Sequence, residues 1–148
     1  MTTSEGKCLN CGVPQGSVLG PRKYCLYSKP IGAICSRHNF LYHCYADDTL
    51  VYMAVIPKTT WSDVAKKLEA CLADISTWMS ANMLKLSEEK TELIIFNTKH
   101  QVRMNRELRL QVGNNTVSVA SSVKNLGVYF DTSLTMERQV NAISKACY

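Results

Sequence analysis

The stretch Tyr45-Ala46-Asp47-Asp48 lies between two short runs rich in aromatic and aliphatic residues, Phe40–Tyr45 and Leu50–Val55. Runs of this composition favour β-strands, and a short polar link between two of them predicts a β-hairpin. The link, Ala46–Thr49, therefore places two adjacent carboxylates at the tip of a hairpin. Asp is also common in solvated turns, so for the pair by itself an ordinary solvated Asp-Asp turn is the favoured interpretation.

The segment before this hairpin predicts a turn followed by a broken helix. Gly12–Pro21 contains three glycines and two prolines, which is typical of a turn rather than of the interior of an element. Apolar residues between Tyr24 and Ile34 could line one side of a helix. We expect Pro30 and Gly32 to interrupt it, because proline removes a helical hydrogen bond and glycine is flexible.

After the hairpin, the sequence predicts an amphipathic helix from about Asp63 onward. Its apolar stripe recurs every three or four residues, at Val64, Leu68, Cys71, Ile75 and Trp78. Thr60 followed by Asp63 is typical of a capped helix start. Because Trp78 falls on the stripe, we expect it to pack in a core rather than to stack on a base.

The last third of the chain predicts further strands and a final helix. We expect a short buried strand at Leu93–Phe96, a hairpin of Leu108–Val112 with Val117–Val119, a single strand at Val123–Phe130, and an amphipathic helix from Met136. Helices and strands in this order indicate an α+β fold with an antiparallel sheet.

The composition is that of a globular domain. The chain has 148 residues, of which 46% are hydrophobic and 20% charged, and this excludes disorder as its main state. No apolar run approaches the roughly 20 residues that a membrane-spanning helix needs, and the polar N-terminus does not resemble a signal peptide. We expect a cytoplasmic or nuclear protein that is not secreted and does not contact a membrane.

Cysteines and basic residues allow more than one interpretation. Seven scattered cysteines favour reduced thiols over a disulfide framework. Cys8 and Cys11 have the spacing of a zinc knuckle, but no second pair completes it. The net charge of +5 is compatible with a nucleic-acid partner. A basic stretch could contact phosphates, although a solvated loop is the favoured interpretation; its residues are Lys99, His100, Arg103, Arg106 and Arg109.

The adjacent carboxylates of Asp47 and Asp48 indicate a bound cation if the hairpin tip is functional. Like charges at neighbouring positions repel, and a cation relieves that repulsion. Carboxylate oxygens suit Mg²⁺, which one or two carboxylates usually hold together with substrate phosphates. Two such ions can stabilise the attacking and leaving oxygens of a phosphoryl transfer.

Four groups of residues together resemble the reverse transcriptases of non-LTR (LINE-type) retrotransposons. The motifs occur in the family's order and spacing, and the resemblance covers nearly the whole chain from Gly12. They are Gly12–Pro21, Tyr45–Asp48, the segment from Trp78 through Asn82–Leu86 to Lys90–Glu92, and Leu126–Val128.

The resemblance implies a partial polymerase palm, an antiparallel sheet with helices on one face, plus the start of the thumb and without the fingers. Residues 1–11 would form a tail, 12–131 the partial palm, and 132–148 the start of a truncated thumb-side helix. The parent enzyme would be an RNA-directed DNA polymerase that uses an RNA template, a DNA primer, dNTPs and Mg²⁺ or Mn²⁺. Its other partner would be the rest of the retrotransposon polyprotein.

The resemblance also implies roles for individual residues. Lys90 would assist departure of pyrophosphate, although a solvated charge at that position is an equal alternative. The remaining roles are metal binding and catalysis at Asp47 and Asp48, the nucleotide and primer-end pocket at Tyr45 and Ala46, template and nucleotide positioning at Gln15 and Gly16, and the primer grip at Leu126 and Gly127.

Two departures from the family pattern bear on activity. The family palm has a further aspartate before the Gly12 loop, whereas Glu5 is the sole carboxylate among residues 1–11. Arg22 and Lys23 stand where the family usually has apolar residues, and their charges would be costly if that helix face were buried. We therefore expect an inactive polymerase in isolation, with a non-catalytic nucleic-acid-binding remnant as the alternative.

A primer-extension assay checks this expectation. The purified chain is supplied with a primed RNA template, dNTPs and Mg²⁺ or Mn²⁺. We expect it to add no nucleotides, because one of the carboxylates that bridge the catalytic metal ions is absent and catalysis depends on their charge and geometry. Template-dependent extension of the primer would contradict it.

Overall fold

The computed structural model describes residues 16–56, 59–97 and 108–147. These residues form a mixed α and β structure, as predicted, and divide into two compact units, Met1–Ala54 and Val55–Tyr148, each of which we describe by itself. The helices are α1 (Gly20–Arg37), α2 (Trp61–Ala81), the single 3₁₀ turn η1 (Glu88–Lys90) and α3 (Glu137–Ala146). The strands are β1 (Leu41–Tyr45), β2 (Asp48–Tyr52), β3 (Arg109–Val112), β4 (Asn115–Ser118), β5 (Ser122–Asn125) and β6 (Val128–Asp131).

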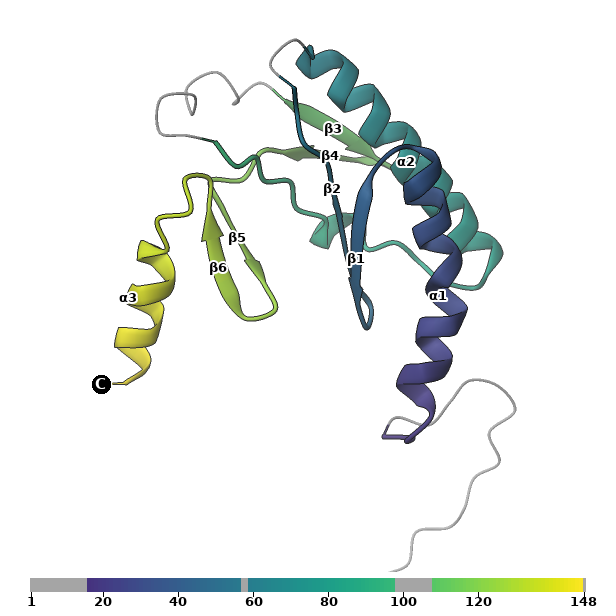
Figure 1. Cartoon of the computed structure of the whole chain (residues 1–148), viewed down its shortest axis with the longest axis horizontal. Coiled ribbons are helices and arrows are strands. Elements are labelled where there is room, and N and C mark those ends of the chain that lie inside the picture. The colour runs from purple at the N-terminus through teal and green to yellow at the C-terminus, as the bar shows by residue number, and fades with distance from the viewer. Residues whose placement is uncertain (1–15, 57–58, 98–107, 148) are drawn as a thin grey trace, which may run out of the picture. The chain divides into compact units, whose positions relative to one another are not determined.

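The strands do not form the single antiparallel sheet that we predicted. Within the described residues they make three separate two-stranded antiparallel sheets, β1–β2, β3–β4 and β5–β6. One helix packs on each: α1 contacts β1, α2 contacts β3, and α3 contacts β6 (Figure 1). An isolated two-stranded hairpin is marginally stable in water, so each sheet needs packing against another element, such as its helix.

In the first unit, α1 is continuous, and the predicted interruption at Pro30 is wrong. Pro30 lies inside the helix, as Gly32 also does, and the helix ends only at Arg37. Proline inside a helix costs about 3 kcal/mol. Burial of Ile31 and Ile34, each about 1.5–3 kcal/mol, offsets this cost in the turn that follows Pro30.

Gly32 has a packing role in α1 rather than a helix-breaking one. A Cβ atom placed on Gly32 would overlap the aromatic ring of Tyr42 in β1. The missing side chain therefore lets this strand residue lie directly on the helix. After α1, the Phe40 N–H donates to the Cys35 carbonyl at 2.9 Å, and both side chains are buried, which fixes the turn from helix to strand.

In the second unit, α2 has the predicted cap and stripe. Thr60 is the N-cap residue, and its Oγ1 accepts a hydrogen bond from the Asp63 N–H at 3.2 Å. Val64, Cys71 and Ile75 are buried on the predicted face. Trp78 is half-buried, which agrees with the prediction that its side chain packs against the protein.

Helix α2 packs against the β3–β4 hairpin. Leu110 and Val112 alternate with exposed residues on β3 and are buried. The Glu69 carboxylate of α2 also accepts a hydrogen bond from the Gln111 N–H at 2.8 Å, which satisfies an edge donor of the hairpin. The hairpin was predicted, but β4 begins at Asn115 and not at Val117, so the predicted turn Gly113–Asn115 is shortened to Gly113-Asn114.

Two strand predictions in this unit are wrong. Leu93–Phe96 is not a buried strand: a single bridge joins Leu93 to Val119, and Phe96 is 50% exposed. Val123–Phe130 is not one strand but most of the β5–β6 hairpin, which turns at Leu126-Gly127. Both residues of that turn have positive φ, 48° and 85°, the conformation of a type I′ turn, which reverses the chain between the two strands.

Helix α3 begins after a loop that Asp131 organises. The Asp131 carboxylate accepts hydrogen bonds from the N–H groups of Ser133, Thr135 and Met136, and from the Thr135 hydroxyl. These bonds, the Thr135 N–H first, hold the pKa of Asp131 below its ordinary value. Helix α3 was predicted from Met136 and begins at Glu137. Among the described helices, we find none with the length and hydropathy of a membrane span.

Replacing Thr60 by Ala tests the cap of α2. We expect the free energy of unfolding to fall by about 1 kcal/mol, because the Asp63 N–H loses its side-chain acceptor at the helix start. Thr77→Ala, at an exposed position in the same helix, is the matched control and should change stability by less than about 0.5 kcal/mol. Urea denaturation followed by circular dichroism measures both, and equal effects would contradict the assignment of the cap.

Candidate functional site

The carboxylate pair lies where the sequence predicted, at the tip of the β1–β2 hairpin, but the turn is tighter. Only Ala46 and Asp47 link the strands, and Tyr45 pairs with Asp48 across them. Asp48 is therefore the first residue of β2 instead of the third residue of a four-residue link. Asp47 occupies the turn itself.

Backbone strain accompanies this turn. Ala46 has a φ of 52°, in the left-handed region. An L-residue other than glycine adopts this region at a cost of roughly 1–2 kcal/mol. Such strain persists only where the surrounding structure over-determines it, and it is often found at functional sites.

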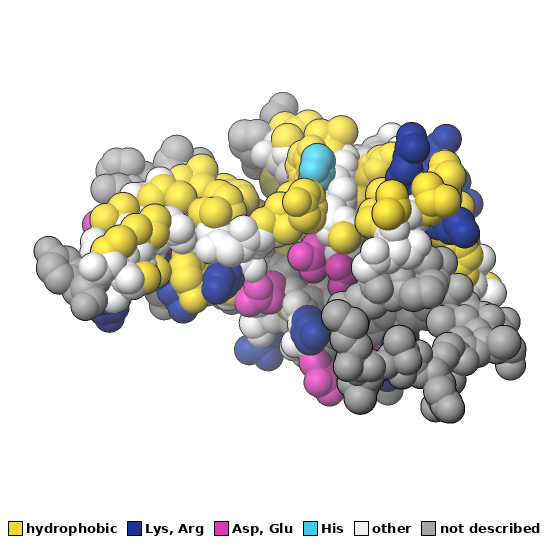
Figure 2. Space-filling view, turned by 90° about the horizontal axis from the view of Figure 1, so that it is seen from below, with side chains coloured by type: hydrophobic (Ala, Val, Ile, Leu, Met, Phe, Trp, Pro, Cys, Tyr) yellow, Lys and Arg dark blue, Asp and Glu magenta, His cyan; other side chains and the backbone are white. Residues whose placement is uncertain are grey.

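The tip is open to solvent. Tyr45, Ala46 and both aspartates are exposed, and the Tyr45 side chain is 62% exposed. Other large side chains of the hairpin are exposed as well, at Leu41, Tyr42, Leu50 and Tyr52. Figure 2 shows hydrophobic side chains, drawn in yellow, over much of the face that it displays. The hairpin thus presents its carboxylates without burying them.

Tyr24 of α1 belongs to the same site, although the sequence analysis missed it. Burial is the largest cause that raises the pKa of the Tyr24 phenol, and the Asp47 carboxylate is the next. Electrostatic interactions with Cys44 and Cys25 raise the pKa of Tyr24 further. A negative charge acts on a phenol in this way only at short range, so Tyr24 lies near the hairpin tip.

The packing of α1 on β1 explains the position of Tyr24. Gly32 of α1 lies against Tyr42 of β1. Tyr24 is two turns earlier in the helix, about 12 Å along its axis at 1.5 Å per residue. From Tyr42 to the turn, β1 covers a similar length at about 3.3 Å per residue. The sequence could have indicated this position of Tyr24, because Tyr24, Ser28 and Gly32 recur every four residues and therefore lie on one face of the helix.

The donor set at the tip suits a hard divalent cation. Aspartate oxygens are the ligands that Mg²⁺ and Mn²⁺ accept, and Mg²⁺ needs only one or two of them when water and phosphates complete its coordination. Within the described ranges, no cluster of three or more His, Cys, Asp or Glu side chains could hold a metal. Asp47 and Asp48 could therefore hold such an ion only together with ligands from a substrate or from other residues.

The other predicted site residues have the following positions. Lys90 ends η1 in the second unit and is exposed. Leu126 and Gly127 form the exposed turn of β5–β6. Gly16 has a φ of 85°, with no atom within 4 Å of a Cβ built on it. Gln15 lies outside the described residues.

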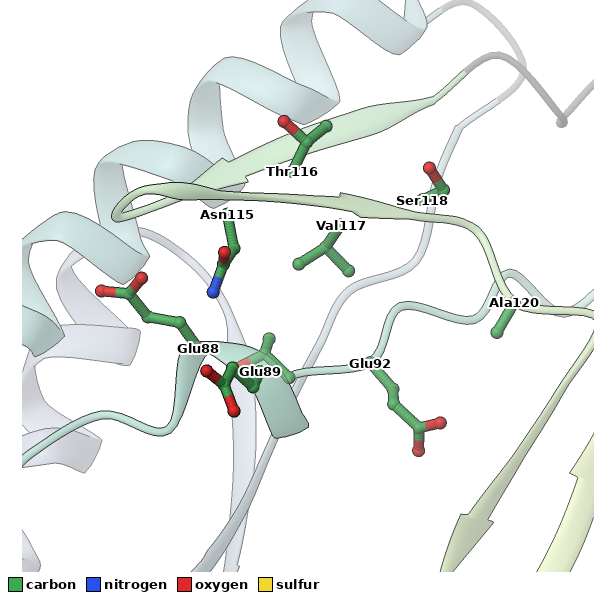
Figure 3. A pocket seen from close by; sticks show the side chains of 9 residues that line it. Glu88, Glu89, Glu92, Asn115, Thr116, Val117, Ser118 and Ala120 are labelled. Carbon is green, nitrogen blue, oxygen red and sulfur yellow. The ribbon is translucent and has the colours of Figure 1, made fainter.

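A hollow of about 500 Å³ lies next to Lys90 but does not include it. In Figure 3, Asn115 and Val117 of β4 point toward η1, whereas Thr116 points away. Glu88 of η1 accepts a hydrogen bond from the Asn114 N–H at 3.1 Å. That carboxylate is therefore occupied in holding the β3–β4 turn.

The structure also bears on the predictions for the charged residues of α1, for the cysteines and for the basic stretch. Arg22 and Lys23 are exposed on α1, so the structure avoids the cost of burying their charges. Among the described cysteines, the thiols of Cys35 and Cys71 are buried, and those of Cys25, Cys44 and Cys147 are exposed. The pair Cys8 and Cys11 lies outside the described residues, as does the basic stretch apart from Arg109.

A comparison with protein-family models decides the family. The model described as reverse transcriptase (RNA-dependent DNA polymerase) matches residues 1–130, most of the chain. The chain belongs to the reverse transcriptase family. The matched region contains α1, the Asp47 hairpin, α2 and most of the β5–β6 hairpin.

A curated relative is compatible with this assignment. A probable RNA-directed DNA polymerase from transposon BS of Drosophila melanogaster is 27% identical over 148 residues, which include 96% of this chain. The reverse transcriptase chain spans 16% of the length of that relative. No solved structure matches it significantly.

A titration tests whether Tyr24 lies beside the carboxylate tip. With ¹³C-labelled tyrosine, NMR follows each phenol separately. We expect Asp47→Asn to lower the Tyr24 pKa toward its ordinary value without reaching it, because burial, the larger cause, remains. Asp48→Asn is the matched control and should leave the Tyr24 pKa nearly unchanged. No response to either substitution would remove Tyr24 from the site.

Proposed function

We propose that this reverse transcriptase chain contributes the metal-binding hairpin of the palm of a non-LTR type polymerase. In this proposal Asp47 and Asp48 hold Mg²⁺ or Mn²⁺ for transfer of a nucleotide from a dNTP to a DNA primer on an RNA template. The observation that carries it is the tight, strained turn that displays two adjacent carboxylates in a chain of this family. The transposon polymerase among its relatives supports a retrotransposon origin.

The two carboxylates have different positions in this proposal. Asp47 lies in the turn, whereas Asp48 begins β2 and pairs with Tyr45. Asp47 therefore lies at the outermost part of the hairpin, whereas the backbone of Asp48 is engaged in strand pairing. We assign the larger share of metal binding to Asp47. A bound divalent ion would neutralise charge on the phosphates of the nucleotide.

The neighbouring residues would organise that site. Tyr45 and Ala46 would border the nucleotide and the primer end, because they flank Asp47 directly. Tyr24 would support the tip from α1. Gln15 and Gly16 would position the template, and an open glycine with positive φ allows close approach of a nucleic-acid backbone.

The second unit would supply the remaining parts. Lys90, exposed at the end of η1, would assist departure of pyrophosphate by placing a positive charge near it. The turn Leu126-Gly127 would be the primer grip, and α3 would be the beginning of the thumb. Helices α1 and α2 would be palm helices, each packed on a hairpin.

Metal binding by single-site variants tests the proposal. Electron paramagnetic resonance measures free Mn²⁺ in the presence of the chain. We expect Asp47→Asn to weaken Mn²⁺ binding roughly tenfold, because one of at most two protein carboxylates is removed. Asp48→Asn should have a smaller effect.

Asp74→Asn is the matched control, since Asp74 is an exposed aspartate on α2. It should bind Mn²⁺ as the parent chain does. Circular dichroism verifies that each variant retains its helices. Equal binding by the Asp47→Asn and Asp74→Asn variants, or no Mn²⁺ binding by the parent chain, would overturn the assignment of the metal site.

A further inference from the structure

Strand β2 has an unpaired outer edge within the described residues. Among residues 16–56, 59–97 and 108–147, β1 and β2 make a sheet of their own. Their register is continuous from the pair Leu41 and Tyr52 to the pair Tyr45 and Asp48, so no bulge interrupts the edge. Proteins usually protect such an edge with lysine, proline, a bulge or a covering element. The five residues of β2 include neither lysine nor proline.

Helix α1 packs on β1 and makes no contact of that extent with β2 (Figure 1). This packing decides which edge can meet a second copy of the chain. Neighbouring strands lie about 4.8 Å apart, whereas packed helices need 8–10 Å. If two copies paired through β1, their α1 helices would lie on the same side of the sheet and overlap. Pairing through β2 places the two β1 strands about 14 Å apart, which leaves room for both helices.

The hydrogen-bond pattern of the hairpin decides which groups of β2 face outward. The link has two residues, and the closing pair of such a hairpin, here Tyr45 and Asp48, exchanges its bonds within the hairpin. Because antiparallel pairs alternate, Leu50 also bonds to β1, whereas the N–H and C=O groups of Thr49 and Val51 point away from it. A twofold axis at Leu50 would therefore place Thr49 of each copy opposite Val51 of the other, where these groups can bond.

The side chains of β2 are compatible with this register. Val51 pairs with Tyr42, which lies against α1, so Leu50 and Tyr52 are on the opposite face of the hairpin. They are 47% and 46% exposed. At the axis, Leu50 would meet Leu50 of the second copy, and such apolar cross-strand pairs stabilise sheets. Asp48 would lie opposite Tyr52 of the second copy and about 13 Å along the strand from its Asp48, so like charges stay apart.

We propose that the chain forms a twofold dimer in which β2 pairs in the antiparallel direction with β2 of a second copy. The dimer would contain one sheet of four strands, in the order β1, β2, β2, β1. Pairing along a single five-residue edge buries less than the roughly 1,200 Å² of a stable interface. We therefore expect a weak, concentration-dependent dimer with a dissociation constant in the micromolar range. The contact uses the backbone of Thr49 and Val51 and is independent of the proposed metal site.

Sedimentation equilibrium of the full chain tests the proposal. The parent chain is measured at concentrations from about 1 μM to 1 mM, which bracket the affinity of a small interface. We expect the average mass to rise from that of a monomer to that of a dimer. Leu50→Lys should weaken dimerisation roughly tenfold or more, because like charges would then face each other at the axis.

Leu41→Lys is the matched control, because Leu41 is exposed on the same face of the hairpin but belongs to β1. The added charge is the same, and it lies about 10 Å from the nearest strand of the second copy, beyond the Debye length at physiological salt. It should change the dissociation constant by less than about twofold. Circular dichroism checks that both variants keep their secondary structure.

Amide hydrogen exchange, followed by NMR, gives a second measurement that needs no substitution. Raising the protein concentration above the dissociation constant should slow exchange of the Thr49 and Val51 N–H groups several-fold, because these groups become bonded in the dimer. The N–H groups of Tyr42 and Cys44 point outward from β1 and provide the internal control. Their exchange should not depend on protein concentration.

Three results would each overturn the proposed dimer. The first is a monomer at every concentration. The second is equal weakening by Leu50→Lys and Leu41→Lys, which would indicate contact through the whole face of the hairpin. The third is concentration-dependent protection of Tyr42 and Cys44 in place of Thr49 and Val51, which would indicate pairing through β1.

Discussion

The two-residue turn at Ala46 and Asp47 is the constraint on which the candidate site depends. The left-handed backbone of Ala46 lets Tyr45 and Asp48 pair directly, so no loop separates the carboxylates from the rigid hairpin. Both the strained backbone and the adjacent like charges are unfavourable, and they occur at the same place. In the proposed metal site, a divalent cation would relieve the repulsion between the carboxylates.

The hairpins depend in turn on the helices that pack on them. Each of the three described hairpins has only two strands and packs on a helix. In the first unit, the contact of Gly32 with Tyr42 aligns α1 with β1 and so brings Tyr24 near Asp47. A change in that packing would therefore reach the carboxylate tip without touching either aspartate.

Membership of the reverse transcriptase family connects the two kinds of charge in this chain. A polymerase handles a polyanion, and it needs cations both from solution and from its own side chains. In our proposal, Asp47 and Asp48 would hold the former, and Lys124 and Arg138 are exposed cations of the second unit. The two groups lie in different units, and each is ordered by its own hairpin.

The sequence by itself determined the features that depend on near neighbours. The cap at Thr60, the stripe of α2 and the hairpin at Asp47 follow from residues a few positions apart, and the structure contains all of them. Tertiary structure alone decided that α1 continues through Pro30, since burial of Ile31 and Ile34 offsets the cost of the proline. It also decided that Tyr24 lies within electrostatic reach of Asp47 and that Arg138 lies on the Tyr129 ring. These contacts join residues that are distant in the chain, and no local pattern encodes such distances.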